Sequence, residues 1–221
     1  MLERGVADGA VCLGDLPDDW GRGYDMQLYE QTYDAAIAFA RRHPSMRWWW
    51  GNHDLSYWWQ KAEGGFSVHA SDTVRAKLWE LQRSLGDDSP ITCVQRVGNA
   101  AFSHAGVSEE FVRGRVRALD PVVDVDDVDA VIRATNRLGA REMWDDGTPI
   151  WLRSGECDRL CREGSLLHVV GHTSVERPTE VVGAPAVPTA HRERRVAGAP
   201  ACVARRRRLP AYRPCLAMCS R

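Results

Sequence analysis

The stretch RWWWGNHDLSYWW, residues 47–59, places a polar segment between two groups of aromatic side chains. Its tryptophans at 48–50 form a short apolar run, which predicts a buried strand. Gly51-Asn52-His53-Asp54 follows at once and brings a glycine, an amide, an imidazole and a carboxylate. This segment is either an ordinary turn or a reactive site at the end of a buried strand. The rest of the chain distinguishes these two interpretations.

Polar residues follow other predicted strands in the same way. Three further apolar runs end in this pattern: 10–13 in Gly14-Asp15, 100–103 in His104, and 166–170 in Gly171-His172. In open α/β sheets, ligands gather at the carboxyl ends of the strands. The repeated pattern therefore predicts that these polar groups lie together.

Segments with helical spacing separate the strands. Apolar positions recur every three or four residues over 26–40, with Asp25 as the helix cap, and again from Ser71 to Leu85. Residues 108–118 and 125–138 are also predicted to be helical. The runs 91–95 and 100–103, joined by a short glycine-containing turn, predict a β-hairpin. Strands that alternate with helices indicate an α/β fold, and the hairpin indicates mixed sheets.

Four residues at the strand ends form a candidate metal site. They supply a carboxylate, an amide oxygen and two imidazoles: Asp15, Asn52, His104 and His172. This mixture suits Mn²⁺, Fe²⁺ or Zn²⁺ better than Ca²⁺ or Mg²⁺, which prefer oxygen ligands. Taken alone, each would be an ordinary loop or core residue, but their shared position after strands favours metal ligation. His53 and Asp18 could form a histidine–carboxylate pair that acts as a proton donor.

Four sequence blocks in this order carry a family resemblance. They are GDLPDDWG (14–21), GNHD (51–54), SHAG (103–106) and GHT (171–173). The chain resembles the calcineurin-like metallophosphoesterases from residue 10 to about residue 180. Within that family it is most similar to the branch of Ser/Thr protein phosphatases and bacterial dinucleoside-tetraphosphatase-like enzymes.

The resemblance implies a fold, a site and a reaction. The fold would be a four-layer α/β/β/α sandwich with two metal ions, manganese being the first expectation, at the strand ends. Asp15 would bridge the ions, and Asn52, His104 and His172 would complete one of them. A metal-bound hydroxide would attack a phosphomonoester or phosphoanhydride. Substrates would be phosphorylated small molecules, nucleotides or phosphoproteins.

Two further residues take their roles from the same resemblance. His53, oriented by Asp18, would protonate the leaving oxygen. Arg153, in Trp151-Leu152-Arg153, would hold a phosphate oxygen, with a solvated surface charge as the alternative.

The chain departs from the family pattern ahead of the Gly14-Asp15 loop. The family has an Asp-x-His motif there that ligates the second metal, but residues 1–9 contain no histidine. We therefore expect the N-terminal strand to be missing, one ion to be held, and activity to be weak or absent. Asp19 stands where the protein-phosphatase branch has an arginine that contacts phosphate.

The composition suggests one folded domain and a basic tail. We expect a domain over residues 1–183 and an Arg/Ala/Pro-rich tail over 184–221 without regular structure. Nine arginines and one glutamate follow residue 190, although the whole chain has a net charge of −1. The tail is either an arm that binds nucleic acid or the product of a shifted reading frame. The second interpretation is favoured by 27 arginines against two lysines, which fits GC-rich coding.

Two alternative functions remain open at this point. One is a catalytically inactive metal-binding domain whose basic tail binds nucleic acid. The other is a phosphodiesterase on the same scaffold, because a fold does not determine a substrate.

Composition also bears on location. No apolar run approaches the roughly 20 residues that cross a bilayer, and the first residues do not form a signal peptide. The seven cysteines have no metal-finger spacing and indicate reduced thiols, so we expect a cytoplasmic location. We expect the tryptophans to pack in the core rather than to stack on substrate.

Overall fold

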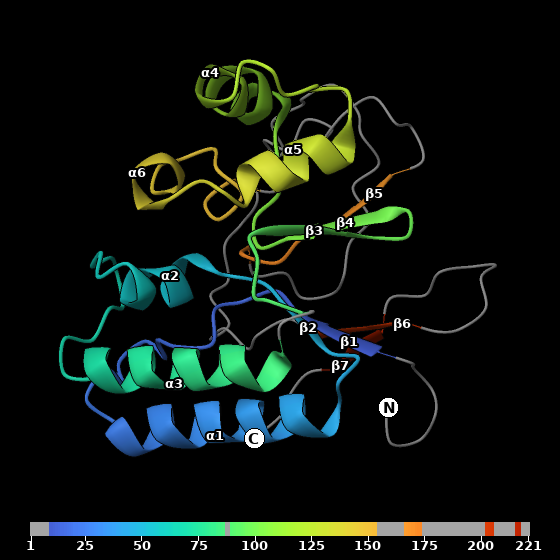
Figure 1. Cartoon of the computed structure of the whole chain (residues 1–221). Coiled ribbons are helices and arrows are strands. Elements are labelled where there is room, and N and C mark those ends of the chain that lie inside the picture. Colours follow the sequence, from blue (N-terminus) through green and yellow to red (C-terminus); the bar gives the residue numbers. More distant parts are fainter. Residues whose placement is uncertain (1–8, 87–88, 154–165, 174–201, 206–214, 218–221) are drawn as a thin grey trace. The chain divides into compact units, whose positions relative to one another are not determined.

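The computed structural model of the 221-residue chain describes residues 9–86, 89–153 and 166–173, and the backbone of 202–205 and 215–217 (Figure 1). The chain divides into two compact units, residues 1–91 with 197–221 and residues 92–196. The single domain expected over residues 1–183 stays a prediction. The α/β class is confirmed, with helices and two small sheets.

The first unit contains a four-stranded mixed sheet. Its strands are β1 (Gly9–Cys12), β2 (Arg47–Trp48), β6 (Cys202–Arg205) and β7 (Cys215–Ala217), in the order β2-β1-β6-β7. β1 pairs parallel with β2, with Val11 opposite Arg47. β1 pairs antiparallel with β6, and β6 antiparallel with β7. The apolar runs that predicted β1 and β2 thus form neighbouring strands.

β6 and β7 lie in the segment for which the sequence indicates no regular structure. Arginine, alanine and proline dominate there without an alternating pattern, so sequence periodicity gave no strand. The remainder of the tail, including 184–201, lies outside the described residues, as do residues 1–8 ahead of β1.

Three helices belong to the first unit: α1 (Met26–Arg42), α2 (Asn52–Trp58) and α3 (Ser71–Leu85). Asp25 caps α1 as predicted, since its side chain accepts a hydrogen bond of 3.0 Å from the Leu28 N–H. α1 and α3 lie side by side (Figure 1). Both bury the apolar face that the sequence pattern indicated, which for α3 includes Val74, Leu78 and Leu81. Burying a leucine fully contributes roughly 1.5–3 kcal/mol, so these faces stabilise the unit.

The aromatic run before the polar segment is core, as expected. Trp48, Trp49 and Trp50 are 4%, 0% and 8% exposed. The ring of Trp50 packs 5.0 Å from that of Trp58, which in turn lies 4.6 Å from Trp79, measured between ring centroids. The end of β2 is therefore anchored in a rigid aromatic cluster.

The second unit contains a three-stranded sheet in the order β3-β4-β5. Its strands are β3 (Val94–Val97), β4 (Ala100–Ser103) and β5 (Leu167–Val169). β3 and β4 form the predicted hairpin, and β4 pairs parallel with β5. The helical elements are a π-helix, η2 (Phe111–Val116), then α4 (Arg117–Leu119), α5 (Val128–Thr135) and α6 (Ala140–Met143).

The same edge-of-sheet arrangement occurs in both units. β1 and β2 are parallel neighbours followed by Asp15 and Asn52, and β4 and β5 are parallel neighbours followed by His104 and His172. Parallel strands end at the same edge of a sheet, so each unit presents one pair of the predicted ligands at such an edge. In the described part of the chain, no helix has the length and apolar character that a membrane crossing requires.

Candidate functional site

Two glycines bring the loops after β1 and β2 into direct contact. Gly14 has a φ of +87°, and a Cβ atom on it would lie 2.6 Å from the Cα of Gly51. A Cβ atom on Gly51 would in turn lie 2.5 Å from the backbone nitrogen of Asp15. Real side chains do not approach so closely, so both positions require glycine. The two loops therefore hold Asp15 and Asn52 at fixed places beside one another.

Asp54 ties the same two loops together. Its carboxylate accepts hydrogen bonds from the N–H groups of Asp15 (2.7 Å), Leu16 (3.3 Å) and Gly51 (2.9 Å). Burial and the nearby charge of Asp15 raise the pKa of Asp54 to about 6, although these N–H donors act in the opposite direction. Asp54 lies in the GNHD block, but no role for it was predicted from the sequence. The available signal was an acidic residue three positions after the glycine that caps α2.

The polar segment after β2 is not a plain turn. Asn52 begins α2, so Asn52 and His53 lie in the first turn of a helix. The N–H of His53 donates to Asp15 Oδ1 over 3.1 Å. The start of α2 thereby holds Asn52 and His53 next to Asp15.

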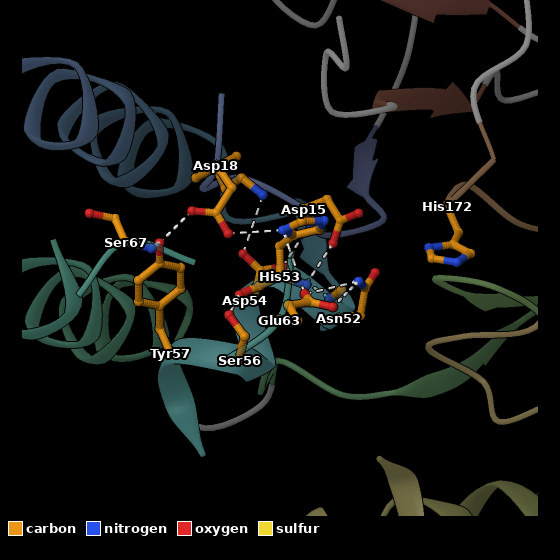
Figure 2. Close-up of polar contacts among 12 residues, drawn as sticks. Asp15, Asp18, Asn52, His53, Asp54, Ser56, Tyr57, Glu63, Ser67 and His172 are labelled. Atoms are coloured by element: carbon orange, nitrogen blue, oxygen red, sulfur yellow. Dashed lines mark hydrogen bonds and ion pairs between the residues drawn. The ribbon is translucent and has the colours of Figure 1, made fainter. Parts of the chain in front are cut away.

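The structure brings His53 and Asp18 together, as the sequence predicted. His53 Nδ1 lies 2.9 Å from Asp18 Oδ2, and the two side chains are 17% and 0% exposed (Figure 2). The hydroxyl groups of Tyr29 and Tyr57 both donate to Asp18 Oδ1. The N–H of Ser67 donates to the Tyr57 oxygen over 2.8 Å. Asp18 is therefore held by partners on both oxygens, and it fixes the ring of His53.

Neighbouring carboxylates favour the charged form of His53. Burial acts to lower the pKa of His53, but the hydrogen bond to Asp18 and the charges of Asp15 and Glu63 outweigh it and raise this pKa to about 9. The imidazole is thus protonated at neutral pH. Because Nδ1 is bound to Asp18, Nε2 carries the proton that can be transferred to another molecule.

Glu63 completes this cluster, and sequence analysis did not identify it. Its two oxygens accept from Asn52 Nδ2 over 3.0 and 3.1 Å, and its Oε1 lies 3.5 Å from His53 Nδ1 (Figure 2). Burial raises the pKa of Glu63 to about 7, while the His53 charge and the Asn52 hydrogen bond oppose that rise. A carboxylate accepts but does not donate, so the contact turns the Asn52 nitrogen toward Glu63 and its oxygen away.

The second unit holds the two predicted histidines as a pair. His104 Nε2 lies 3.0 Å from His172 Nδ1, and His104 is 1% exposed. The N–H of Gly171 donates to the His104 carbonyl over 2.8 Å, which links the ends of β4 and β5. The ring of Trp151 lies edge-on to that of His172, with 5.9 Å between centroids. Two imidazoles are therefore fixed at the edge of this sheet.

Backbone strain marks the predicted residues. Among the described residues, four that are not glycine have a positive φ: Asp15 (58°), Asp18 (73°), Gln60 (54°) and His172 (55°). Three of these four are predicted site residues. The left-handed conformation is uncommon for such residues, and it costs of order 1–3 kcal/mol each. Strain of this kind often marks functional sites, although aspartate and histidine adopt a positive φ more readily than most residues, and the site itself stays a prediction.

The remaining predicted positions lie near the surface. Arg153 is exposed and follows Trp151. Its contact with phosphate stays a prediction. The Asp19 carboxylate lies 3.8 Å from the guanidinium of Arg22, which binds Asp25 more closely, at 2.5 Å. The charge of Arg22 is therefore shared between the two carboxylates.

The four predicted ligands are distributed equally between the units. Asp15 and Asn52 belong to the first unit, and His104 and His172 to the second. Their convergence on a single ion stays a prediction. Comparison of the chain with protein-family models, with curated proteins and with solved structures gives no match. Function is therefore argued from the chemistry of these residues.

Proposed function

We propose that this chain is a metal-dependent phosphoesterase that hydrolyses phosphomonoesters or phosphoanhydrides. The observation that carries the proposal is the His53–Asp18 pair, 2.9 Å apart, beside Asp15 and Asn52 at the ends of parallel strands. A fixed proton donor next to oxygen ligands is the arrangement that hydrolysis of a phosphate ester needs. A four-layer α/β/β/α sandwich, with the two mixed sheets as its inner layers, belongs to the same proposal.

The donor set supports a first-row divalent metal. The two imidazole nitrogens of His104 and His172 are 3.0 Å apart. These two nitrogens now share a hydrogen bond, and both could instead bind one divalent ion if the proton between them were released. With Asp15 and Asn52 as oxygen ligands, Mn²⁺ is expected first, and Fe²⁺ or Zn²⁺ are alternatives. When bound, the metal would polarise the phosphoryl group and lower the pKa of a water molecule.

The chain's own residues would carry out the proton transfer. As the ester P–O bond breaks, the leaving oxygen gains negative charge and takes the proton from His53 Nε2. Asp18 keeps the ring in position and stabilises its charge until that moment. Water adds to phosphorus and releases a proton to solvent, the alcohol and phosphate leave, and solvent returns a proton to His53. The four ligands proposed here serve a single ion, so we propose one ion per chain.

The test is hydrolysis of phenyl phosphate, whose leaving oxygen is basic enough to need a proton, with Mn²⁺ or with EDTA. We expect phosphate release only with Mn²⁺, and His53→Ala should reduce kcat about 100-fold or more, the usual contribution of a general acid. His43→Ala is the matched control, because His43 contacts Phe39 at the end of α1. Release that is unaffected by EDTA, or equal in the His53→Ala variant, would disprove the proposal.

Two further measurements separate the alternative functions. A phosphodiesterase would hydrolyse the diester bis(p-nitrophenyl) phosphate faster than the monoester p-nitrophenyl phosphate. An inactive chain that binds nucleic acid through its basic tail would show binding that weakens steeply with salt and no Mn²⁺-dependent hydrolysis.

A further inference from the structure

Trp20 differs from the tryptophans of the core. Its side chain is 66% exposed, whereas Trp48 to Trp50 are at most 8% exposed. Tryptophan is usually well buried, because it has a large apolar surface. Trp20 also lies directly after Asp18 and Asp19 in the loop that carries the proton donor's partner. Core packing therefore does not account for its position.

The exposed ring of Trp20 is held beside His53. The two ring centroids are 6.4 Å apart, and the ring planes are nearly perpendicular, at 81°. The indole also lies close to the loop between α2 and α3, where a Cβ atom on Gly64 would lie 3.1 Å from Trp20 Cη2. The glycine thus lets this loop approach the indole closely. The ring is placed next to the group that would protonate a leaving oxygen.

Other exposed apolar side chains lie in the same two loops. Tyr24 and Val68 are 82% and 77% exposed, and the ring of Tyr24 lies 5.0 Å from that of His69 between centroids. The Ser67 hydroxyl donates to the Gly23 carbonyl over 2.5 Å and joins the two loops. The loop that carries Trp20 is therefore joined to the loop between α2 and α3, and both loops expose apolar side chains.

We propose that Trp20 forms a subsite for an aromatic ring on the leaving group, which makes aryl phosphates the preferred substrates. The inference rests on the proposed function, because His53 must meet the leaving oxygen for Trp20 to meet the group attached to it. Hydrolysis would break the P–O bond of the aryl ester and release a phenol, with its proton from His53, and inorganic phosphate.

The short distance between the two rings favours aryl esters over nucleotides. The His53 and Trp20 ring centroids are 6.4 Å apart, so a leaving oxygen about 3 Å from His53 Nε2 and on the Trp20 side of the imidazole would lie a few ångströms from the indole. An aryl ester carries its ring directly on that oxygen, so the ring reaches the indole. In a nucleoside 5′-phosphate a ribose separates the oxygen from the base and carries the base beyond Trp20.

The test is equilibrium binding of phosphonates that cannot be hydrolysed, measured by calorimetry with Mn²⁺. Benzylphosphonate has the shape of phenyl phosphate, ethylphosphonate lacks the ring, and cyclohexylmethylphosphonate has a ring of similar size that is not aromatic. We expect the full chain to bind benzylphosphonate about tenfold more tightly than ethylphosphonate, in the range that stacking on one aromatic side chain gives. Trp20→Ala should reduce this preference to less than twofold, and Trp20→Phe should retain most of it.

Leu119→Ala is the control, because Leu119 is also an exposed apolar residue, at 54%, and lies on α4 in the other unit. This variant should keep the preference for benzylphosphonate. The inference is overturned if Trp20→Ala keeps the preference, if cyclohexylmethylphosphonate binds as well as benzylphosphonate, or if no phosphonate binds.

Turnover distinguishes failure of the inference from failure of the proposed function. Phenyl phosphate, methyl phosphate and adenosine 5′-monophosphate are compared by their release of phosphate. Hydrolysis without an aryl preference, or with a nucleotide preference, overturns the subsite and leaves the phosphoesterase intact. A ring preference in binding that depends on Trp20, without hydrolysis of any ester, upholds the subsite and overturns the phosphoesterase.

Discussion

At the scale of single residues, Glu63 determines which atom of Asn52 can serve as a ligand. An asparagine amide can face a neighbour with its nitrogen or its oxygen, and only the oxygen can bind a metal. Both oxygens of Glu63 lie within 3.1 Å of Asn52 Nδ2, which directs the amide nitrogen to Glu63. Residues that orient a ligand in this way contribute to metal affinity without touching the ion.

We therefore expect Glu63→Leu to weaken Mn²⁺ binding by about 10- to 100-fold, the usual cost of losing such a partner. The measurement is calorimetric titration of the purified chain. Asn52→Ala should cause a similar loss, and the double variant should lose little more, because both changes remove the same ligand. Glu80→Leu is the control, since Glu80 pairs with Arg41 on the surface. If the loss of Mn²⁺ binding free energy in the double variant equals the sum of the two single losses, Glu63 does not act by orienting Asn52.

At the scale of elements, the contact between the β1 and β2 loops depends on glycine. A Cβ atom on Gly51 would lie 2.5 Å from the Asp15 nitrogen, whereas one on Gly114, in η2, would meet nothing within 4 Å. Gly51→Ala should lower the free energy of unfolding by about 2 kcal/mol or more, because backbone must move to admit the methyl group. Gly114→Ala should raise it by about 0.5–1 kcal/mol, because alanine favours helix. Thermal unfolding measures the stability of both variants. If the two substitutions change it equally, the close contact between the β1 and β2 loops is contradicted.

Helices whose apolar residues recur with a regular helical period were predicted from the sequence, whereas elements without such a period were missed. α1 and α3 bury a helical stripe, and Asp25 supplies the cap, so both were predicted almost to their ends. α2 was missed because its first turn consists of polar site residues and the helix has only seven residues. The pairing of His53 with Asp18 followed from motif order. Glu63 could not be found, because only the folded loop brings it to Asn52.

At the scale of the whole molecule, the proposed function needs ligands from both units. Asp15 and Asn52 come from the first unit and the two histidines from the second. If all four bind one ion, removing a ligand from either unit must weaken the same binding event. We therefore expect Asp15→Ala and His104→Ala each to abolish tight Mn²⁺ binding, with one ion bound per unmodified chain.

The physical reason is that a ligand that binds only the folded state stabilises every part that contributes to its site. At a concentration 100 times the Kd, this gain is about 2.7 kcal/mol. Mn²⁺ should therefore slow hydrogen exchange near Asp15 and near His104 together, and either alanine variant should remove both effects. Slower hydrogen exchange in one unit alone would show that Asp15 and Asn52 do not share an ion with the two histidines. Loss of Mn²⁺ binding in Asp15→Ala but not in His104→Ala would show the same. His168→Ala is a suitable control, because His168 lies on β5 yet is not among the proposed ligands.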